Sequence, residues 1–222
     1  MGNLYLVRHA QASLGADDYD HLSDMGERQS LQLGRYLSSK KISFDAVLSG
    51  TLRRHSQTLA GISEGMDTPL HTVQWPGLNE YDSAAVIGAT HSEPLLKPST
   101  PEGYRQHFLL LRQGLVLWMH GKTAPLGMPS WIDFRQGVVD VLTHIQQSGA
   151  EQVLLISSGG PIACILSHVL QTPPESTVEL NMRLRNSAIS ELVFSPKRYA
   201  LQTYNTLPHL DSSEFNNWIS HA

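Results

Sequence analysis

Short apolar runs of strand length recur along the chain, and longer amphipathic segments separate them. The runs at residues 4–7, 44–48 and 153–156 each predict a strand, and the last is apolar without interruption. A continuous apolar run is typical of a strand that is covered on both faces. Residues 188–194 and 199–204 predict two further strands, and the Ser-Pro-Lys-Arg segment between them predicts an antiparallel hairpin.

The segments between the strands have the periodicity and the capping residues of helices. Ser23, followed by Asp24 and Glu27, predicts a helix that runs to about residue 38. Serine is a favourable N-cap, and carboxylates in the first turn suit the helix dipole. Apolar residues at spacings of three and four predict one face of a helix over residues 104–119. Further helices are predicted over residues 51–63, 134–145 and 163–170.

The order of these elements predicts an α/β fold. We expect a three-layer sandwich, with a mostly parallel central sheet and helices on both of its faces. The stretch at about residues 75–135 interrupts the alternation, and prolines flank its predicted helix. We interpret this stretch as a largely helical insertion over the site, and residues 1–222 as a single domain.

Composition indicates an ordinary globular protein. The 222 residues are 41% hydrophobic and 16% charged, which suits a chain with a substantial core. A formal net charge of −4 gives no basic field for nucleic acid. We find no apolar run of membrane-spanning length and no signal-peptide pattern, so we expect no membrane contact and a cytoplasmic location. The single cysteine, Cys164, allows no intrachain disulfide and is expected to be a buried helix residue.

Polar residues follow several predicted strands at their carboxyl ends, where open α/β sheets bind ligands. Arg8 and His9 follow the first strand. Arginine matches phosphate oxygens, and histidine suits nucleophilic or proton-transfer chemistry. Later strands are followed by Ser49-Gly50-Thr51-Leu52-Arg53-Arg54, by Leu78-Asn79-Glu80 and by Ser157-Ser158-Gly159-Gly160. The last segment leads into a helix, whose N-terminal N–H groups favour an anion, so we expect phosphoryl chemistry at this edge.

The chain resembles the histidine phosphatase superfamily, which includes the cofactor-dependent phosphoglycerate mutases. The resemblance rests on Leu6-Val7-Arg8-His9, Leu22-Ser23-Asp24-Met25-Gly26-Glu27-Arg28-Gln29, Ser49-Gly50-Thr51-Leu52-Arg53-Arg54-His55-Ser56-Gln57-Thr58 and Leu78-Asn79-Glu80. The Ser-x-Gly-Gly turn at residues 157–160 agrees as well. The resemblance is specific over residues 1–80 and carries little over about residues 81–150 and over the last ~20 residues.

The resemblance implies a phosphatase of the histidine acid phosphatase type and a role for each matching residue. His9 would be the nucleophile, which forms a phosphohistidine and divides one difficult step into two. Arg8 and Arg54 would hold the phosphoryl oxygens, and Glu80 would protonate the leaving oxygen and then activate water. Ser158 and backbone groups near Gly159 and Gly160 would complete the phosphate pocket. Asp82 is the alternative acid.

Ser158 occupies the position at which most of the family has a second histidine that donates to the phosphoryl group. Loss of such a donor costs about 2.7–4 kcal/mol, or about 10²–10³ in rate. Ser158 can donate in its place, another histidine can reach in, with His55 the nearest in sequence, or turnover can be slow or absent. A further alternative is that Ser158 caps the helix that follows it.

Other functions stay open at this point. The main alternative is a catalytically impaired protein that binds a phosphorylated ligand. A phosphomutase is disfavoured because the middle segment has no compact basic cluster. A serine hydrolase with Ser158 as nucleophile and His9 as base lacks the G-x-S-x-G elbow. We expect a small phosphorylated substrate or a phosphoprotein as partner, and neither a cofactor nor a metal, since no metal-binding spacing of His or Cys is present. The substrate and the oligomeric state stay open.

Overall fold

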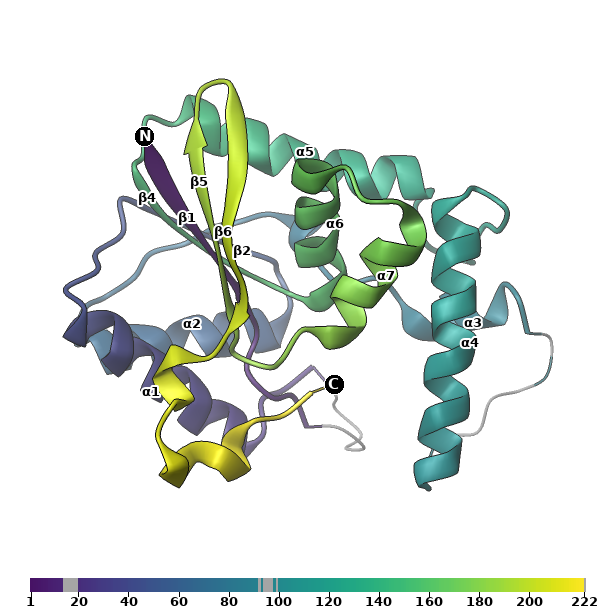
Figure 1. The fold of residues 1–222 in the computed structure, drawn as a ribbon, viewed down its shortest axis with the longest axis horizontal. Coiled ribbons are helices and arrows are strands. Elements are labelled where there is room, and N and C mark those ends of the chain that lie inside the picture. The colour runs from purple at the N-terminus through teal and green to yellow at the C-terminus, as the bar shows by residue number, and fades with distance from the viewer. Residues whose placement is uncertain (14–19, 92, 94–97, 99, 222) are drawn as a thin grey trace.

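The computed structural model describes residues 1–221 apart from residues 14–19, 92, 94–97 and 99. Within them, one six-stranded sheet forms the centre of the molecule, in the order β3-β2-β4-β1-β5-β6 (Figure 1). The strands are β1 (Gly2–Arg8), β2 (Ala46–Ser49), β3 (Val73–Gln74), β4 (Gln152–Ser157), β5 (Ile189–Ser195) and β6 (Arg198–Thr206).

Four of the strands are parallel, and the last two form an antiparallel hairpin at one edge. β1 pairs with β4, β4 with β2 and β2 with β3, all in parallel register. β5 runs antiparallel to β1 and to β6. The predicted mostly parallel sheet with a terminal hairpin is therefore confirmed. Because β1, β2 and β4 are parallel neighbours, their carboxyl ends lie at the same edge of the sheet.

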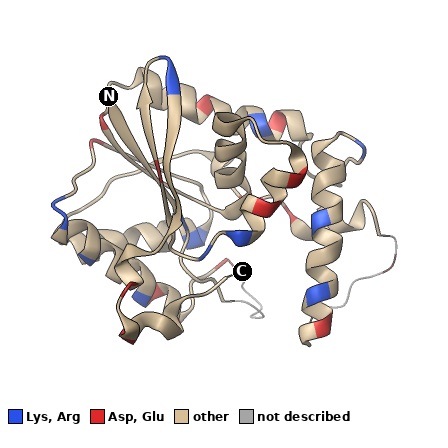
Figure 2. Ribbon diagram, in the orientation of Figure 1, with Lys and Arg blue, Asp and Glu red and all other residues tan. Residues whose placement is uncertain are grey.

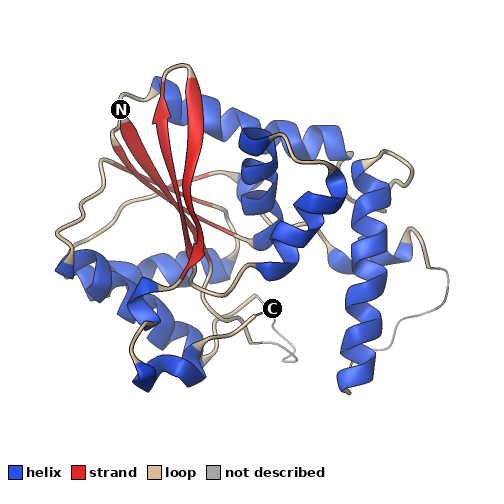
Figure 3. Cartoon of the chain, viewed as in Figure 1, coloured by secondary structure: helices blue, strands red, loops and turns tan. Residues whose placement is uncertain are grey.

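Seven helices surround the sheet in the described part of the chain (Figure 3). They are α1 (Asp24–Ser39), α2 (Arg53–Met66), α3 (Ser83–Gly88), α4 (Pro101–Met119), α5 (Trp131–Gln147), α6 (Gly159–Leu170) and α7 (Pro174–Arg183). Short 3-10 turns occur at η1 (Pro76–Leu78), η2 (Pro208–Leu210) and η3 (Ser213–Trp218). Figure 1 shows α1 and α2 on one side of the sheet and α5 and α6 on the other, as a three-layer fold requires.

Alternating strand residues divide the core into two layers. On one face, Val7 and Ile156 pack in one cluster with Leu33 of α1 and Ile62 of α2. On the other face, residues of opposite parity, such as Leu155, pack with Val138 of α5 and Ile165 of α6. Successive side chains of a strand point to opposite faces, so a continuously apolar strand such as β4 supplies both layers.

The capping residues set the starts of two helices where the sequence predicts them. The Ser23 side chain accepts a hydrogen bond from the Gly26 amide at the start of α1. The Ser130 side chain accepts one from the Asp133 amide at the start of α5. The sequence analysis did not predict α3 and α7. α3 has only six residues, and α7 buries few of its side chains, so neither carries a strong periodic pattern.

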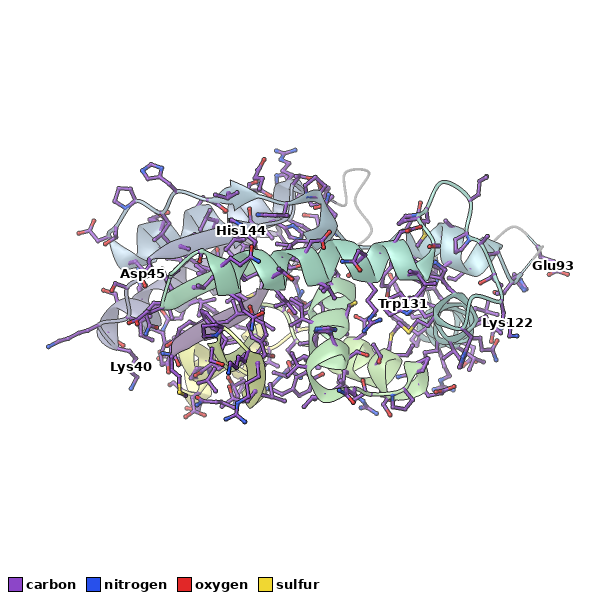
Figure 4. All side chains as sticks on the ribbon, turned by 90° about the horizontal axis from the view of Figure 1, so that it is seen from above. Lys40, Asp45, Glu93, Lys122, Trp131 and His144 are labelled. Atoms are coloured by element: carbon purple, nitrogen blue, oxygen red, sulfur yellow. The ribbon has the colours of Figure 1, made fainter. Side chains whose placement is uncertain are left out.

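The middle stretch packs on the same core as the sheet. Trp118 of α4 is almost fully buried, and its ring centroid lies 5.2 Å from those of Trp131 and Phe134 in α5. Figure 4, seen from above, shows Trp131 at the end of α5 nearest α4 and His144 toward the other end. This packing supports the prediction of a single domain with a helical insertion, which stays a prediction.

None of the helices in the described part of the chain combines the length and the apolar composition that a membrane span needs. Basic and acidic residues are interspersed over the helices in Figure 2, and neither sign covers one side of the ribbon in that view.

Candidate active site

Hydrogen bonds between neighbouring strand ends bring three polar loops together. His9 follows β1, and its amide donates to the Ser157 carbonyl at 2.8 Å. Gly50 follows β2, and its amide donates to the Ile156 carbonyl of β4 at 3.1 Å. The loops after β1, β2 and β4 therefore lie side by side at the carboxyl edge of the sheet, as the sequence predicts.

His9 is buried, and its ring is held in one tautomer. Its Nδ1 lies 2.8 Å from the Ala10 carbonyl oxygen. A carbonyl only accepts, so Nδ1 carries the ring proton and Nε2 keeps its lone pair. Burial holds the pKa of His9 well below its usual value, and the charges of Arg8 and Arg54 and the neighbouring His55 act in the same direction. His9 is therefore neutral at pH 7, with an unprotonated Nε2.

Two polar residues of the matching segments hold the backbone after His9. The Ala10 amide donates to Thr58 Oγ1 at 3.1 Å. The Gln11 amide donates to Gln29 Oε1 at 2.8 Å. Thr58 and Gln29 thus satisfy backbone donors of this buried loop, which explains why residues of this type follow at these positions of α1 and α2.

Arg54 is fixed between two of the loops. Its side chain is almost fully buried, and its Nη1 forms an ion pair with Asp20 Oδ1 at 2.7 Å. Asp20 also accepts from the Arg53 amide at 2.8 Å, in the first turn of α2. The sequence analysis did not single out Asp20, because it belongs to none of the matching segments. Asp20 lies 33 positions before Arg53 in sequence, so no local pattern pairs it with the start of α2.

Arg8 is buried beside His9, and the structure also fixes its orientation. Its Nη1 donates to the Leu184 carbonyl, after the end of α7. Its positive charge lowers the pKa of both His9 and Glu80. The structure therefore places both predicted phosphate-binding arginines close to the predicted nucleophile and the predicted acid.

Glu80 is held against the start of α6. The Gly160 amide donates to both carboxylate oxygens of Glu80, at 3.0 and 3.3 Å. A Cβ at Gly160 would lie 2.3 Å from Glu80 Oε1, so only glycine admits this approach. The amide of Gly160 is thus occupied by Glu80, which differs from the expectation that it serves the phosphate. Gly159 is buried in the same turn.

Two opposing effects act on the pKa of Glu80. Burial raises it, and the charges of Arg54 and Arg8 and the hydrogen bonds from the Gly160 and Tyr81 amides lower it. The net effect is a raised pKa, because burial is the largest of these effects. A carboxyl group with a raised pKa can give up a proton at mildly acidic to neutral pH.

Further hydrogen bonds fix the loop that carries Glu80. Ser157 Oγ donates to the Leu78 carbonyl at 2.7 Å. The Thr51 amide donates to Asn79 Oδ1 at 2.7 Å, which joins this loop to the one after β2. Asp82, the alternative acid, is exposed and accepts from two amides at the start of α3. Asp82 therefore has a capping role.

The Ser158 hydroxyl points to a histidine. Ser158 stands at the N-cap of α6, but its side chain makes no capping hydrogen bond, so the capping alternative is wrong. Its Oγ lies 2.8 Å from His55 Nε2 and 3.5 Å from Arg54 Nη2. Ser158 and His55 are both fully buried, and the His55 and His9 ring centroids are 5.8 Å apart.

Residues 4–207 match the model of a family described as the histidine phosphatase superfamily, branch 1. A comparison with curated proteins finds no match.

Solved structures with the same fold include three enzymes, each under 25% identical to this chain. A mycobacterial glucosyl-3-phosphoglycerate phosphatase is 19% identical with a TM-score of 0.65, over 93% of this chain and 99% of its own. A phosphoserine phosphatase from Entamoeba histolytica is 19% identical with a TM-score of 0.67, over 95% and 100%. A phosphoglycerate mutase from Bacillus anthracis is 19% identical with a TM-score of 0.64, over 94% of each chain. These likenesses establish the α/β fold of the histidine phosphatases.

Proposed function

The chain belongs to branch 1 of the histidine phosphatase superfamily, and from that premise we propose that it hydrolyses phosphomonoesters through a phosphohistidine on His9. The observation that carries this proposal is the state of His9. Its ring is buried and neutral, its Nδ1 is committed to the Ala10 carbonyl, and two buried arginines lie close to it. An imidazole in that state is a nucleophile beside an anion-binding pair.

In the first step, Arg8 and Arg54 bind the phosphoryl oxygens, and Nε2 of His9 attacks phosphorus. The bond from phosphorus to the ester oxygen breaks, and Glu80 gives its proton to that leaving oxygen. The raised pKa of Glu80 supports this role, because it keeps a larger fraction of the carboxyl protonated near neutral pH. The arginine charges stabilise the phosphoryl oxygens in the transition state.

In the second step, water attacks the phosphohistidine. The Glu80 carboxylate takes a proton from the attacking water, the bond between phosphorus and Nε2 breaks, and its electron pair returns to His9. Glu80 is protonated again at the end, so the two steps form a closed cycle. Its fixed position against the Gly160 amide supports this double use.

Ser158 and Gly159 complete the phosphate-binding set in this proposal. Ser158 would take the place of the second histidine found in most of the family, and Gly159 opens α6, whose N-terminus favours an anion. A neutral hydroxyl is a weaker donor than a charged imidazole, so slower turnover is expected than with histidine at that position.

The class of substrate is a small phosphorylated molecule. Two of the similar structures are phosphatases whose names specify glucosyl-3-phosphoglycerate and phosphoserine. Both names describe phosphate esters of small molecules, which supports this class for the present chain. A phosphoprotein stays the alternative class of partner.

Steady-state hydrolysis of p-nitrophenyl phosphate, compared between wild type and His9→Ala, tests the proposal. We expect wild-type activity and its loss in His9→Ala. The matched control is His71→Ala, an exposed histidine outside the site, which should keep wild-type activity. Unchanged turnover in His9→Ala would refute the proposal. Binding of inorganic phosphate without turnover in wild type would instead favour the catalytically impaired binding protein.

A further inference from the structure

The two steps above give no role to His55, the buried hydrogen-bond partner of Ser158. His55 Nε2 and Ser158 Oγ are 2.8 Å apart, and neither residue has any exposed surface. Burial of two polar side chains is costly unless they form hydrogen bonds, and here the two side chains partner each other. This pair touches the site on both sides, through Arg54 at Ser158 and through the ring of His9 at His55.

We propose that His55 and Ser158 act together as one relayed hydrogen-bond donor to the bound phosphoryl group. His55 takes up a proton when the ligand binds, and the Ser158 hydroxyl then donates a hydrogen bond to a phosphoryl oxygen. The inference deepens the proposed function, since it takes a phosphoryl group as the ligand.

The resting arrangement directs the Ser158 proton away from the site. Arg54 Nη2, at 3.5 Å, can only donate to the Ser158 oxygen. With the ring proton of neutral His55 on Nδ1, Nε2 offers a lone pair, and the Ser158 hydroxyl donates to it at 2.8 Å. In this tautomer Ser158 alone gives no donor to a ligand, and a change at His55 is needed to turn the hydroxyl.

The charges around His55 explain why its ring is neutral without a ligand and why bound phosphate favours its protonated form. Burial and the charge of Arg54 lower the pKa of His55 to about 3, and Asp20 and the Gly50 backbone oppose them only in part. The ring of His9 faces it and is neutral. A phosphate bound at Arg54 adds negative charge at the point where the arginine now disfavours the imidazolium. Binding therefore favours a proton on His55.

The proton transfer balances without any other reactant. A substrate that binds as the monoanion gives its P–O–H proton to Ser158 Oγ, while the Ser158 proton moves to His55 Nε2. The phosphoryl group is then a dianion, and His55 carries the positive charge. Nε2 now donates to Ser158 Oγ, and the new hydroxyl proton donates to the phosphoryl oxygen. One neutral hydroxyl thus becomes a charge-assisted donor.

A glycine in the loop after β2 makes room for this histidine. A Cβ at Gly50 would lie 2.3 Å from His55 Nδ1 and 2.7 Å from Asn79 Oδ1. No side chain fits between the imidazole and the loop that leads to Glu80. The space occupied by the His55 ring is therefore available only because residue 50 is glycine.

The chain contains a matched control for His55. Ser187 Oγ and His209 Nε2 are 2.9 Å apart, and both residues are buried. Burial, with the charge of Arg185, lowers the pKa of His209 to about 3 as well. This second pair has the same chemistry, but neither of its side chains contacts Arg54 in the described structure. If phosphate changes the protonation of His55 but not that of His209, the change is specific to the candidate site.

Imidazole NMR on the whole protein, labelled with ¹⁵N, tests the inference directly. Resonances are assigned with His55→Gln and His209→Gln, and pH is varied from 5 to 8 with and without inorganic phosphate. We expect phosphate to raise the pKa of His55 to at least about 5, and to leave His209 neutral. In Ser158→Ala the response of His55 should largely disappear. A His55 that stays neutral at pH 5 with phosphate bound, verified by ³¹P line broadening, would overturn the relay.

Kinetics with p-nitrophenyl phosphate give a second, independent measurement. Ser158→Ala and His55→Gln should each lower kcat by about 10²-fold, and the double variant should be no slower than either one. If the fold losses in kcat of the two single variants instead multiply in the double variant, the relay is contradicted. His55→Ala combined with Ser158→His, which places an imidazole at residue 158, should be about tenfold faster than His55→Ala. Retained phosphate binding shows that each variant is folded.

Failure of the relay and failure of the proposed function give different results. Active wild type with unaltered kcat in His55→Gln refutes the relay and leaves the phosphohistidine mechanism in place. A protonated His55 in the phosphate complex, without any phosphohistidine on His9, supports the relay and refutes the mechanism.

Discussion

At the scale of single residues, the charge of Arg54 affects the protonation of three groups in the site. Its charge lowers the pKa of His9, of His55 and of Glu80. Burial is the main cause that keeps the two imidazoles neutral, and Arg54 adds to it while limiting the rise in the pKa of the acid. Asp20 holds the arginine at 2.7 Å. A bound phosphate would compete with Asp20 for this charge and would alter three titrations together.

Replacement of Glu80 by glutamine tests the proposed acid. With an alkyl phosphate, E80Q should be slower by about 10²–10⁴-fold, since glutamine cannot protonate the leaving oxygen. The loss should be smaller with p-nitrophenyl phosphate, whose leaving group departs without a proton. Because the pKa of Glu80 is raised and the protonated form is active, wild-type kcat/KM for the alkyl ester should fall as pH rises through that pKa.

Two results would contradict this assignment. One is an equal loss in E80Q for both esters, and the other is an alkaline limb that persists in E80Q. The matched control is D82N, because asparagine at the exposed cap of α3 keeps an acceptor for the Ala84 and Ala85 amides. D82N should keep wild-type activity with both esters.

The sequence predicted most residues of the candidate site, but not how they are connected. Arg8, His9, Arg54 and Glu80 are predictable because each directly follows an apolar strand or belongs to a long matching segment. The contact of His55 with Ser158 joins residues 103 positions apart. It depends on the register of β2 on β4, and no local pattern contains that information.

At the scale of elements, short hydrogen-bonded bridges position the site. The end of β4 holds the loop after η1 through Ser157 Oγ and the Leu78 carbonyl, at 2.7 Å. The loop after β2 joins the same segment through Thr51 and Asn79. Glu80 thus receives its position from two parallel strands, although it lies on neither. Strands and their loops were predictable from apolar runs, including a short strand near residues 70–73, where the structure has β3 at Val73–Gln74. The short α3 and the sparsely buried α7 lack such a pattern.

Substitution of Ser157 by alanine tests this bridge. Both partners are buried at that point, so the variant leaves the Leu78 carbonyl without its donor. We expect a loss of about 1–3 kcal/mol in the free energy of unfolding, and a lower kcat from a less ordered Glu80. Urea unfolding and hydrolysis of an alkyl phosphate measure the two effects. An unchanged kcat would contradict the positioning role, whatever the stability.

At the scale of the whole molecule, strands from distant parts of the chain pair in one sheet. The loops at the carboxyl edge of this sheet form the candidate site. β1 and β4 are neighbours in the sheet although residues 9–151 separate them in sequence. The sequence predicted this α/β sheet, because each buried strand is visible as an apolar run. It did not predict how α4 packs, since contacts such as Trp118 on Trp131 are tertiary. The formal net charge is −4, and basic and acidic residues are interspersed along the ribbon in Figure 2.

Buried neutral histidines predict a pH-dependent stability of the fold. The pKa of each of His9, His55 and His209 lies below the unfolded value of 6.5, to about 3 for the last two. The unfolded chain therefore binds more protons below pH 7, and stability decreases as pH falls from 6.5 toward about 3. Each histidine should remove about 1 kcal/mol between pH 7 and pH 5.5.

Urea unfolding of wild type and H209Q at these two pH values measures this contribution. The difference in unfolding free energy between pH 7 and pH 5.5 should be smaller in H209Q by about 1 kcal/mol. A constant offset of H209Q at both pH values, with the same pH dependence as wild type, would mean that His209 is not neutral in the fold.

The most direct test of the central claim is a rapid-quench experiment with excess p-nitrophenyl phosphate. The account predicts a burst of p-nitrophenolate that equals the enzyme in amount or falls below it, with a matching quantity of acid-labile, alkali-stable phosphoenzyme on His9. Peptide mapping after an alkaline quench would locate the phosphoryl group. Hydrolysis in wild type without phosphoenzyme at His9, or phosphoenzyme that persists in His9→Ala, would contradict the account.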